Sequence, residues 1–330
     1  MRYGTRGTLI GLIASLTLTL ALTACSGGGG DRNTSAGGSE KTTISVGMLP
    51  VPDAAPLYIA INKGYFAAEG LTVKPELMAQ GTAAALTKQA GGGLDVILGN
   101  YMSVFTAQEK GVGTFTFIAD CYQAGADGFN LMVKSDSPLK SPAELKGRTI
   151  ALNSIGNIGD LAVISTIKGH GLTRDDVTFV EIPFPEMAKA LAEKRVDAAW
   201  LAEPFITYAE KQNAARTLAD TMTGPTKDFP VAGWSVTAEF AKANPGTVAA
   251  FQRAIGKAQA EAAGDRDEVT KVVPTYTKID AQSAAAISLG TFPTAKLDGA
   301  RLQRVADLMR ELGFLTAGLD AKTMVAGQTR

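Results

Sequence analysis

The stretch TTISVGMLPVPDAAPLYIAINKGYFAAEGLTVK, from Thr42 to Lys74, contains the pattern that decides the fold. Ile44–Met48 is a short β-branched run, and a second such run follows at Leu71–Lys74. Between them, Leu57–Lys63 has a helical pattern. A strand, a helix and another strand at this spacing are typical of a βαβ unit with parallel strands. The stretch therefore predicts an α/β fold.

The alternation continues to about Ala219. Further strands are predicted at Asp95–Leu98, Phe115–Asp120, Thr149–Leu152, Val177–Glu181 and Asp197–Leu201, and further helices at Thr82–Gln89, Tyr101–Gln108, Ile158–Lys168 and Glu186–Glu193. They fall into two similar stretches, one running to about Tyr122 and one beginning at about Ser141. This arrangement predicts two α/β lobes with mainly parallel sheets.

Two extended segments, Gly128–Lys134 and Phe229–Thr237, are interpreted as the connections that cross between the lobes. After Glu239 the pattern is helical. Arg301–Leu312 shows it clearly, because its apolar residues recur at helical spacing along one face. We expect these C-terminal helices to pack back on the first lobe.

Composition narrows the possible functions. The chain has 330 residues, of which 45% are hydrophobic, and 32 basic side chains balance 32 acidic ones. No basic stripe interleaved with aromatic residues is present, so the sequence does not predict nucleic-acid binding.

The N-terminus predicts export and lipid anchoring. Arg2 and Arg6 precede an apolar run from Leu9 to Leu22 that is short for a membrane span, which predicts a signal peptide over residues 1–24. The small residues directly before Cys25 resemble a lipobox, which implies a lipid on the Cys25 thiol. Residues 25–41 are rich in Gly and Ser and are predicted to form a flexible tether. We expect the protein at the outer face of the cytoplasmic membrane.

Several quoted stretches together resemble one family. They are Val46-Gly47-Met48-Leu49-Pro50, Ala54-Ala55-Pro56-Leu57-Tyr58-Ile59-Ala60, Lys63-Gly64-Tyr65-Phe66, Glu69-Gly70-Leu71, Asp95–Asn100, Ser141-Pro142-Ala143-Glu144-Leu145-Lys146-Gly147, and Asp197-Ala198-Ala199-Trp200 with Glu203-Pro204. The chain is similar in these places to ABC-importer solute-binding lipoproteins of the nitrate, sulfonate and taurine group. That group is the SsuA/THI5-like, NMT1-type family, which also includes binders of thiamine-precursor pyrimidines.

The resemblance implies a type II periplasmic-binding-protein fold, with two α/β lobes and a hinge of two crossing segments. Lobe I is expected to comprise residues 42–130 plus 222–330, and lobe II residues 131–221. The ligand would be a small organic solute or oxyanion, such as a sulfonate, nitrate, taurine or a pyrimidine, held between the lobes. The implied partners are an ABC permease and its ATPase, and we expect a monomer.

Ligands of open α/β sheets bind beyond the carboxyl ends of the strands, and this rule selects the candidate site. The loops at these ends supply Asp53, Gln80, Gly81, Thr82, Asn100, Tyr101, Ser154, Gly156, Asn157, Trp200 and Glu203. Glycines permit close backbone approach, and helix N-termini offer N–H donors. Asn157 or Ser154 can instead serve as a helix cap, and the aromatic residues can instead be core.

The charges in these loops bear on the ligand. Asp53 and Glu203 repel anions, and no Lys or Arg occurs in the selected loops, which favours a ligand with N–H or O–H donors. Trp200, Tyr101 and Phe184 could stack on a flat ring or cover an aliphatic chain. For Glu203, a structural ion pair or a helix N-terminal charge is the alternative role.

The sequence does not predict an enzyme, a cofactor or a metal site. His170 is the only histidine, at a predicted helix end, and Cys121 is the only thiol besides Cys25 and lies in an apolar run. No catalytic triad or phosphate-binding loop can be assembled. Two alternatives remain: a ligand-sensing lipoprotein, or a fold-related enzyme of thiamine-pyrimidine synthesis, although the cysteine-rich motif of those enzymes is absent.

Overall fold

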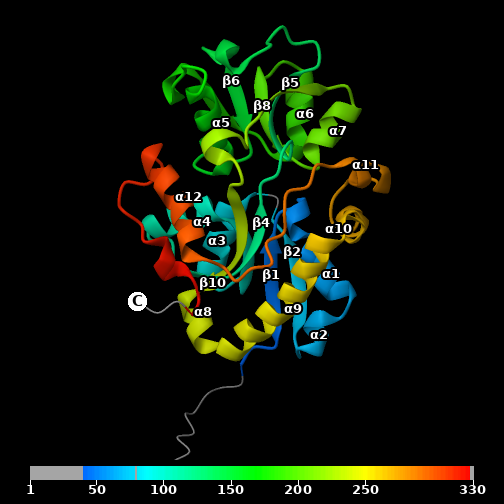
Figure 1. Cartoon of the computed structure of the whole chain (residues 1–330), viewed down its shortest axis with the longest axis vertical. Helices are drawn as coiled ribbons and strands as arrows, with labels where there is room; N and C mark the ends of the chain where they lie inside the picture. The colour runs from blue at the N-terminus through cyan, green and yellow to red at the C-terminus, as the bar shows by residue number, and fades with distance from the viewer. Residues whose placement is uncertain (1–39, 79, 328–330) are drawn as a thin grey trace, which may run out of the picture. The chain divides into compact units, whose positions relative to one another are not determined.

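The computed structural model describes residues 40–78 and 80–327, and these residues form two five-stranded sheets (Figure 1). The first sheet has the order β2-β1-β3-β10-β4. Its strands are β1 (Thr43–Met48), β2 (Thr72–Leu77), β3 (Val96–Asn100), β4 (Phe115–Gln123) and β10 (Pro230–Thr237). The second sheet has the order β7-β6-β8-β5-β9. Its strands are β5 (Phe129–Lys134), β6 (Thr149–Leu152), β7 (Thr178–Glu181), β8 (Ala198–Ala202) and β9 (Ala215–Asp220).

The sheets are mixed, and each contains one antiparallel strand between two neighbours. β10 is antiparallel to β3 and β4, and β5 is antiparallel to β8 and β9. The remaining pairs, β1 with β2 and β3 and β6 with β7 and β8, are parallel as predicted. The predicted α/β class is confirmed.

The two predicted crossing segments are placed differently in the structure. Gly128–Lys134 and Phe229–Thr237 are almost entirely the sheet strands β5 and β10. The chain changes sheets just before each of them, through residues 124–128 and 221–229. Their extended, apolar sequence reflects burial within a sheet, because a strand covered on both faces has a nearly continuous hydrophobic run.

Helices cover both sheets and account for the rest of the fold. Those in the first part of the chain are α1 (Ala55–Asn62), α2 (Tyr65–Ala68), α3 (Thr82–Ala90) and α4 (Tyr101–Glu109). The second sheet carries α5 (Ile158–Lys168), α6 (Phe184–Ala192) and α7 (Phe205–Lys211). The C-terminal helices are α8 (Ala238–Ala243), α9 (Pro245–Gly264), α10 (Arg266–Val272), α11 (Ala281–Ala286) and α12 (Gly299–Glu311).

Most C-terminal helices pack on the first sheet and its helices, as expected from their apolar stripes. α9 contacts α1 and α2, and α12 contacts α4 and β10 (Figure 1). On α12 the predicted stripe is buried at Leu302, Val305, Ala306 and Met309. α11 is the exception, because it also contacts α7 beside the second sheet.

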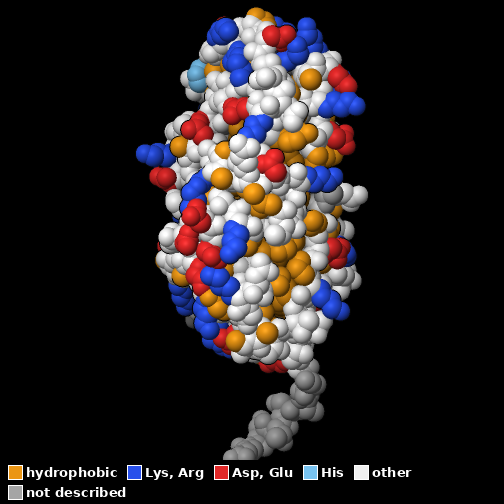
Figure 2. All heavy atoms as spheres, turned by 90° about the vertical axis from the view of Figure 1, so that its right-hand side faces the viewer, with side chains coloured by type: hydrophobic (Ala, Val, Ile, Leu, Met, Phe, Trp, Pro, Cys, Tyr) orange, Lys and Arg blue, Asp and Glu red, His pale blue; other side chains and the backbone are white. Residues whose placement is uncertain are grey.

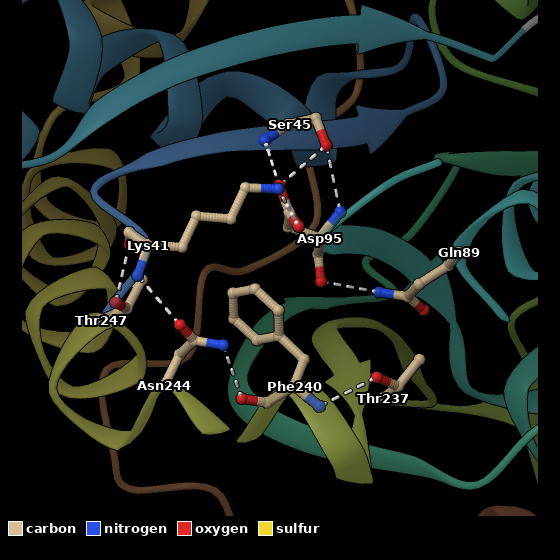
Figure 3. Close-up of polar contacts among 8 residues, drawn as sticks. All are labelled: Lys41, Ser45, Gln89, Asp95, Thr237, Phe240, Asn244 and Thr247. Atoms are coloured by element: carbon tan, nitrogen blue, oxygen red, sulfur yellow. Dashed lines mark hydrogen bonds and ion pairs between the residues drawn. The ribbon is translucent and has the colours of Figure 1, made fainter. Parts of the chain in front are cut away.

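The start of the described chain is fixed to the first sheet by a polar network (Figure 3). The Lys41 ammonium contacts both carboxylate oxygens of Asp95, at 2.7 and 2.8 Å, and Asp95 also accepts from the Ser45 N–H and hydroxyl groups. The Thr247 hydroxyl donates to the Lys41 carbonyl at 2.7 Å. Lys41, predicted as tether, is therefore part of the folded domain, and long-range contacts that composition does not reveal place it there.

Glu40 makes the adjoining contact. Its carboxylate accepts from the Thr247 N–H group at 2.7 Å in the first turn of α9, and this hydrogen bond lowers the pKa of Glu40. A carboxylate at this position also interacts favourably with the helix dipole. Cys25 and the predicted signal peptide lie outside the described residues. None of the helices within residues 40–327 is long and apolar enough to span a membrane.

The Tyr101 ring, at the start of α4, packs directly on the backbone of β10 at Gly233. The Tyr101 hydroxyl donates to Asp120 at 2.6 Å, and the ring lies over Gly233 on β10. A Cβ atom added at Gly233 would lie 2.5 Å from the Tyr101 hydroxyl oxygen and 2.8 Å from two ring carbons. Tyr101 is fully buried, so the ring has no open space into which to move.

We predict that Gly233→Ala lowers the free energy of unfolding by about 1–3 kcal/mol through overpacking. Gly256→Ala is the matched control, because Gly256 is exposed on α9 with nothing within 4 Å of an added Cβ. It should raise stability by up to about 1 kcal/mol through better helix propensity. Urea unfolding of both variants measures the difference, and equal stabilities would contradict the packing argument.

Candidate solute-binding site

One cavity lies between the carboxyl ends of strands from both sheets. Its lining includes residues that directly follow β1, β6 and β8, at Leu49, Asn153 and Glu203, and the last residues of β3. The antiparallel strands contribute their first residues, among them Phe129 and Val231. Its volume is about 60 Å³. One water molecule needs about 10–15 Å³ on the same measure, so the cavity has room for several water molecules or for a small solute.

Aromatic side chains form a continuous wall of the cavity. Phe129 and Trp200 are stacked, with ring centroids 5.7 Å apart and an interplanar angle of 18°. Phe184 lies 5.9 Å from Trp200, and Tyr122 lies 6.5 Å from Phe129. All four rings line the cavity. The wall therefore runs from β4 of the first sheet to the second sheet, and within it only the Phe129 and Trp200 rings are nearly parallel.

Trp200 is both core and cavity wall. It is 1% exposed, and its indole N–H donates to the Thr221 hydroxyl at 3.0 Å. The first turn of α5 approaches the ring so closely that a Cβ at Gly159 would lie 2.8 Å from an indole carbon. With its N–H group bonded internally, Trp200 can offer a solute its ring face.

Asp53 is a buried carboxylate on the cavity wall. It is 9% exposed, and its carboxyl group has support from its own backbone N–H group but from no other residue of 40–78 and 80–327. Burial raises the pKa of Asp53 to about 6. The group is thus ionised at neutral pH although little in its surroundings stabilises the charge.

Glu203 is also on the wall, but its carboxylate is occupied by internal bonds. It accepts from the Thr207 hydroxyl at 2.8 Å, from the Thr207 N–H at 3.1 Å and from the Ser288 N–H at 3.0 Å. Burial raises the pKa of Glu203, and the Ser288 and Thr207 bonds oppose that shift. Glu203 therefore has the helix N-terminal role that the sequence offered as an alternative, because it accepts from Thr207 in the first turn of α7. Its bond from Ser288 also connects the end of β8 to the segment after α11.

The loop that precedes α5 is closed by a capping box. Asn157 accepts from the Gly159 N–H at 2.9 Å, and the Asp160 carboxylate accepts from the Gly156 and Asn157 N–H groups, both at 2.8 Å. Asn157 lines the cavity as well as capping the helix. The Gly156 and Asn157 N–H groups, which lie just before the helix, are thus already bound to a carboxylate of the chain itself.

Asn100 and Thr82 bring the helices α3 and α4 to the first-sheet side of the cavity. The Asn100 amide donates to the Thr82 hydroxyl at 3.2 Å, and its carbonyl accepts from the Ser103 N–H at 2.8 Å as the cap of α4. Both residues line the cavity.

The structure brings six of the eleven predicted site residues to this cavity. Asp53, Thr82, Asn100, Asn157, Trp200 and Glu203 line it, whereas Gln80, Gly81, Tyr101, Ser154 and Gly156 do not. Gln80 is exposed, and Tyr101 turns away to Asp120 and Gly233. The backbone at Gly81 and Gly156 has positive φ values of 88° and 79°, so these glycines shape the loops.

Several lining residues were missed from sequence. They are Leu49, Val51, Leu98, Gly99, Tyr122, Gly128, Phe129, Asn153, Ile158, Ala202, Val231 and Ala232. Phe129 is the first residue of β5 and Val231 is the second residue of β10. The amino ends of these antiparallel strands lie at the cavity, although the binding rule for parallel sheets considers only carboxyl ends. The extended Gly128–Lys134 pattern was the available signal for Phe129.

The charged and reactive groups at the cavity are acidic side chains and a neighbouring buried thiol. No Lys, Arg or His is among its lining residues, and no group of acidic, His and Cys side chains within residues 40–327 could hold a metal ion. Cys121 is fully buried and donates to the Asp53 carbonyl oxygen at 3.1 Å. Burial raises the pKa of the Cys121 thiol, so it is a poor nucleophile.

Comparison with known proteins gives sequence relatives that bind different ligands. The chain is 26% identical over 293 residues to the nitrate/nitrite binding protein NrtA of Nostoc sp., covering 82% of this chain and 66% of that protein. It is 29% identical over 160 residues to the riboflavin-binding protein RibY of Chloroflexus aurantiacus, covering 47% of this chain and 44% of that protein. The chain thus spans less than two thirds of either relative's length.

Among solved structures, the chain is similar to the alkanesulfonate-binding protein SsuA from Xanthomonas axonopodis pv. citri bound to MOPS. The TM-score is 0.74 at 16% sequence identity, over 87% of this chain and 99% of that one. This likeness shows the fold, that of the periplasmic binding proteins. The family model described as NMT1/THI5 like matches residues 51–269, which is more than half of the chain. The chain therefore belongs to the NMT1/THI5-like family.

Proposed function

We propose that this protein is the extracytoplasmic solute-binding lipoprotein of an ABC importer. The observation that carries the proposal is the cavity, which is lined by residues of both sheets and has a continuous aromatic wall. The names of NrtA and SsuA, which describe binding proteins, support it. In this role the protein captures a small solute, releases it to a permease and catalyses no reaction.

Binding would be coupled to movement of two lobes. As predicted from sequence, lobe I would comprise residues 42–130 plus 222–330, and lobe II residues 131–221. Phe129 and Asn130, the first residues of β5, belong to the second sheet and so move with lobe II. Only the segments 124–128 and 221–229 connect the two sheets covalently, and hinge closure around a ligand needs few connections. The hydrogen bond from the Ser288 N–H group to Glu203 adds a non-covalent link between these two parts of the chain.

The surface charge is consistent with a small-molecule ligand. On the face shown in Figure 2, basic and acidic side chains are interspersed, without a broad field of one sign. The balanced charge of the whole sequence agrees with this distribution. This face therefore has no broad electrostatic field that would attract a highly charged polymer such as a nucleic acid.

We expect a bound solute to raise the melting temperature, because a ligand present at a hundred times its Kd stabilises the fold by about 2.7 kcal/mol. A thermal-shift screen with sulfonates, nitrate, pyrimidines, amidines, flavins and aromatic acids would find it. Trp200→Phe should then weaken binding, because the smaller ring changes the shape of the cavity wall and leaves the Thr221 hydroxyl without its indole partner. Trp234→Phe is the matched control, because Trp234 is fully buried but does not line the cavity. Equal Kd values for the two variants in titration calorimetry would contradict this placement of the site.

We expect lobe closure to reduce the radius of gyration when the ligand is bound, since the two lobes approach over the cavity. Small-angle scattering of the purified protein with and without saturating ligand measures this change. The monomer expected from sequence is checked by the scattering mass. An unchanged radius at saturation would contradict the hinge mechanism and leave binding unaffected.

We predict that Cys25 is the lipid-bearing residue, from the lipobox-like sequence before it. Cys25→Ala should abolish metabolic labelling with a fatty acid and move the protein to the soluble fraction, while its melting temperature stays that of the wild type. Cys121→Ala is the control and should retain labelling, because its thiol is buried in the folded domain. Labelling that persists in Cys25→Ala would refute the assignment.

A further inference from the structure

Asp53 is the cavity-lining carboxylate that the fold leaves without a partner. Glu203 has three hydrogen bonds from Thr207 and Ser288, whereas Asp53 is supported only by its own backbone N–H group and by no other residue of 40–78 and 80–327. Both groups are buried, with exposures of 9% for Asp53 and 4% for Glu203. A buried charge is normally paired, because removing it from water is costly. Asp53 lacks this compensation within the described chain.

The groups around Asp53 offer no positive charge. Cys121 and Tyr122 on β4 and Tyr276 next to the short helix Val273–Thr275 are its titratable neighbours, and Glu203 is the other carboxyl group on the cavity. Burial first, and then the Asp53 charge, raise the pKa values of Cys121, Tyr122 and Tyr276. All three are therefore neutral at physiological pH, so the compensating charge is not supplied from these side chains.

The second-sheet side of the cavity adds no positively charged side chain and carries a carboxylate, that of Asp160, at the N-terminus of α5. At the N-terminus of α5, the N–H groups of Gly156 and Asn157 are taken by Asp160. The lining contains no Lys, Arg or His. An anionic group near Asp53 would meet a like charge in a medium of low dielectric constant, where repulsion is strong.

We propose that the solute carries a cationic nitrogen group, such as an ammonium, an amidinium or a protonated aminopyrimidine, which pairs with Asp53 while its apolar or flat part lies on the Phe129–Trp200 wall. This inference rests on the proposed solute-binding function and specifies the class of solute. It concerns the group that faces Asp53, and the remainder of the solute can be neutral or acidic. Nitrate and simple alkanesulfonates, which lack such a group, are excluded.

Two isosteric probe series test the charge requirement. The first is benzamidine, benzamide and benzoate, and the second is acetamidine, acetamide and acetate, so that size and shape stay nearly constant while the charge changes from positive to negative. A third comparison, taurine against methanesulfonate, adds an ammonium group to a sulfonate. The readout is the shift in melting temperature, followed by calorimetry, on the mature protein. Within each series we expect the cation to bind best and the anion worst.

Asp53→Asn keeps the size of the side chain and removes its charge. It should weaken amidinium binding about 10- to 100-fold, as expected for loss of a charge-assisted hydrogen bond. Asp175→Asn is the charge-matched control, because Asp175 is exposed and outside the cavity, and it should leave binding unchanged. Tighter binding of the anionic members, or unchanged amidinium binding in Asp53→Asn, would overturn the inference and leave solute binding intact.

A broad solute screen separates the two levels of the argument. A physiological solute with a cationic nitrogen whose affinity depends on Asp53 supports the inference, and a solute without one overturns it. Failure of the isosteric series together with every solute of the broad screen would overturn the proposed function itself, and the inference with it.

The pH dependence gives a readout that needs no ligand. Burial raises the folded-state pKa of Asp53 from 3.8 to about 6, so the folded protein binds this proton more tightly than the unfolded chain. The associated loss of stability develops as pH rises between these two values and is complete above about pH 6. Asp53→Asn should therefore raise the melting temperature at about pH 8 and have little effect near pH 4. An equal change at both pH values would show that Asp53 is not a buried, uncompensated charge.

Discussion

The direction in which the chain enters each sheet is the constraint on which the rest of the structure depends. The chain leaves the first sheet at the carboxyl end of β4 and enters the second at β5 after residues 124–128. A connection this short can reach only those strand ends of the second sheet that face the first sheet. β5 must then run away from the gap while β6, β7 and β8 run toward it. The return through residues 221–229 imposes the same antiparallel direction on β10.

This constraint explains why one cavity gathers residues from such distant parts of the sequence. With β5 and β10 reversed, the carboxyl ends of the parallel strands in both sheets point into the same gap. Loops that follow those ends need polar residues to cap the adjoining helices, and several of these caps, such as Asn100 and Asn157, also face the cavity. The same side chains therefore cap helices and line the cavity. The amino ends of β5 and β10 complete the cavity with apolar residues.

The two carboxylates on the cavity wall differ in how many hydrogen bonds the protein gives them. This difference determines which of them is available to a ligand. Glu203 is saturated by internal donors, and Asp160 occupies the N-terminus of α5. Asp53 receives no comparable support among residues 40–327. A fold that maximised stability would pair or replace such a group, so an unpaired buried carboxylate at a binding cavity is more consistent with selection for a ligand than with selection for the empty protein. The aromatic wall beside it is largely fixed by stacking and by the Trp200–Thr221 bond.

The sequence by itself determined the strand and helix alternation, the two similar halves and the helical C-terminal part, because these depend on local hydrophobic periodicity. It also selected the loops at which the cavity lies, since strand direction in parallel sheets follows from the βαβ pattern. Only the tertiary structure decided which residues of those loops face the cavity. Both Tyr101, which directly follows β3, and Trp200, which lies in the middle of β8, are buried aromatic residues, yet the first contacts Asp120 and only the second lines the cavity. Likewise, Ser288 reaches Glu203 across 85 positions of the chain. Such contacts depend on how distant segments pack, and no local pattern encodes the direction of a single side chain.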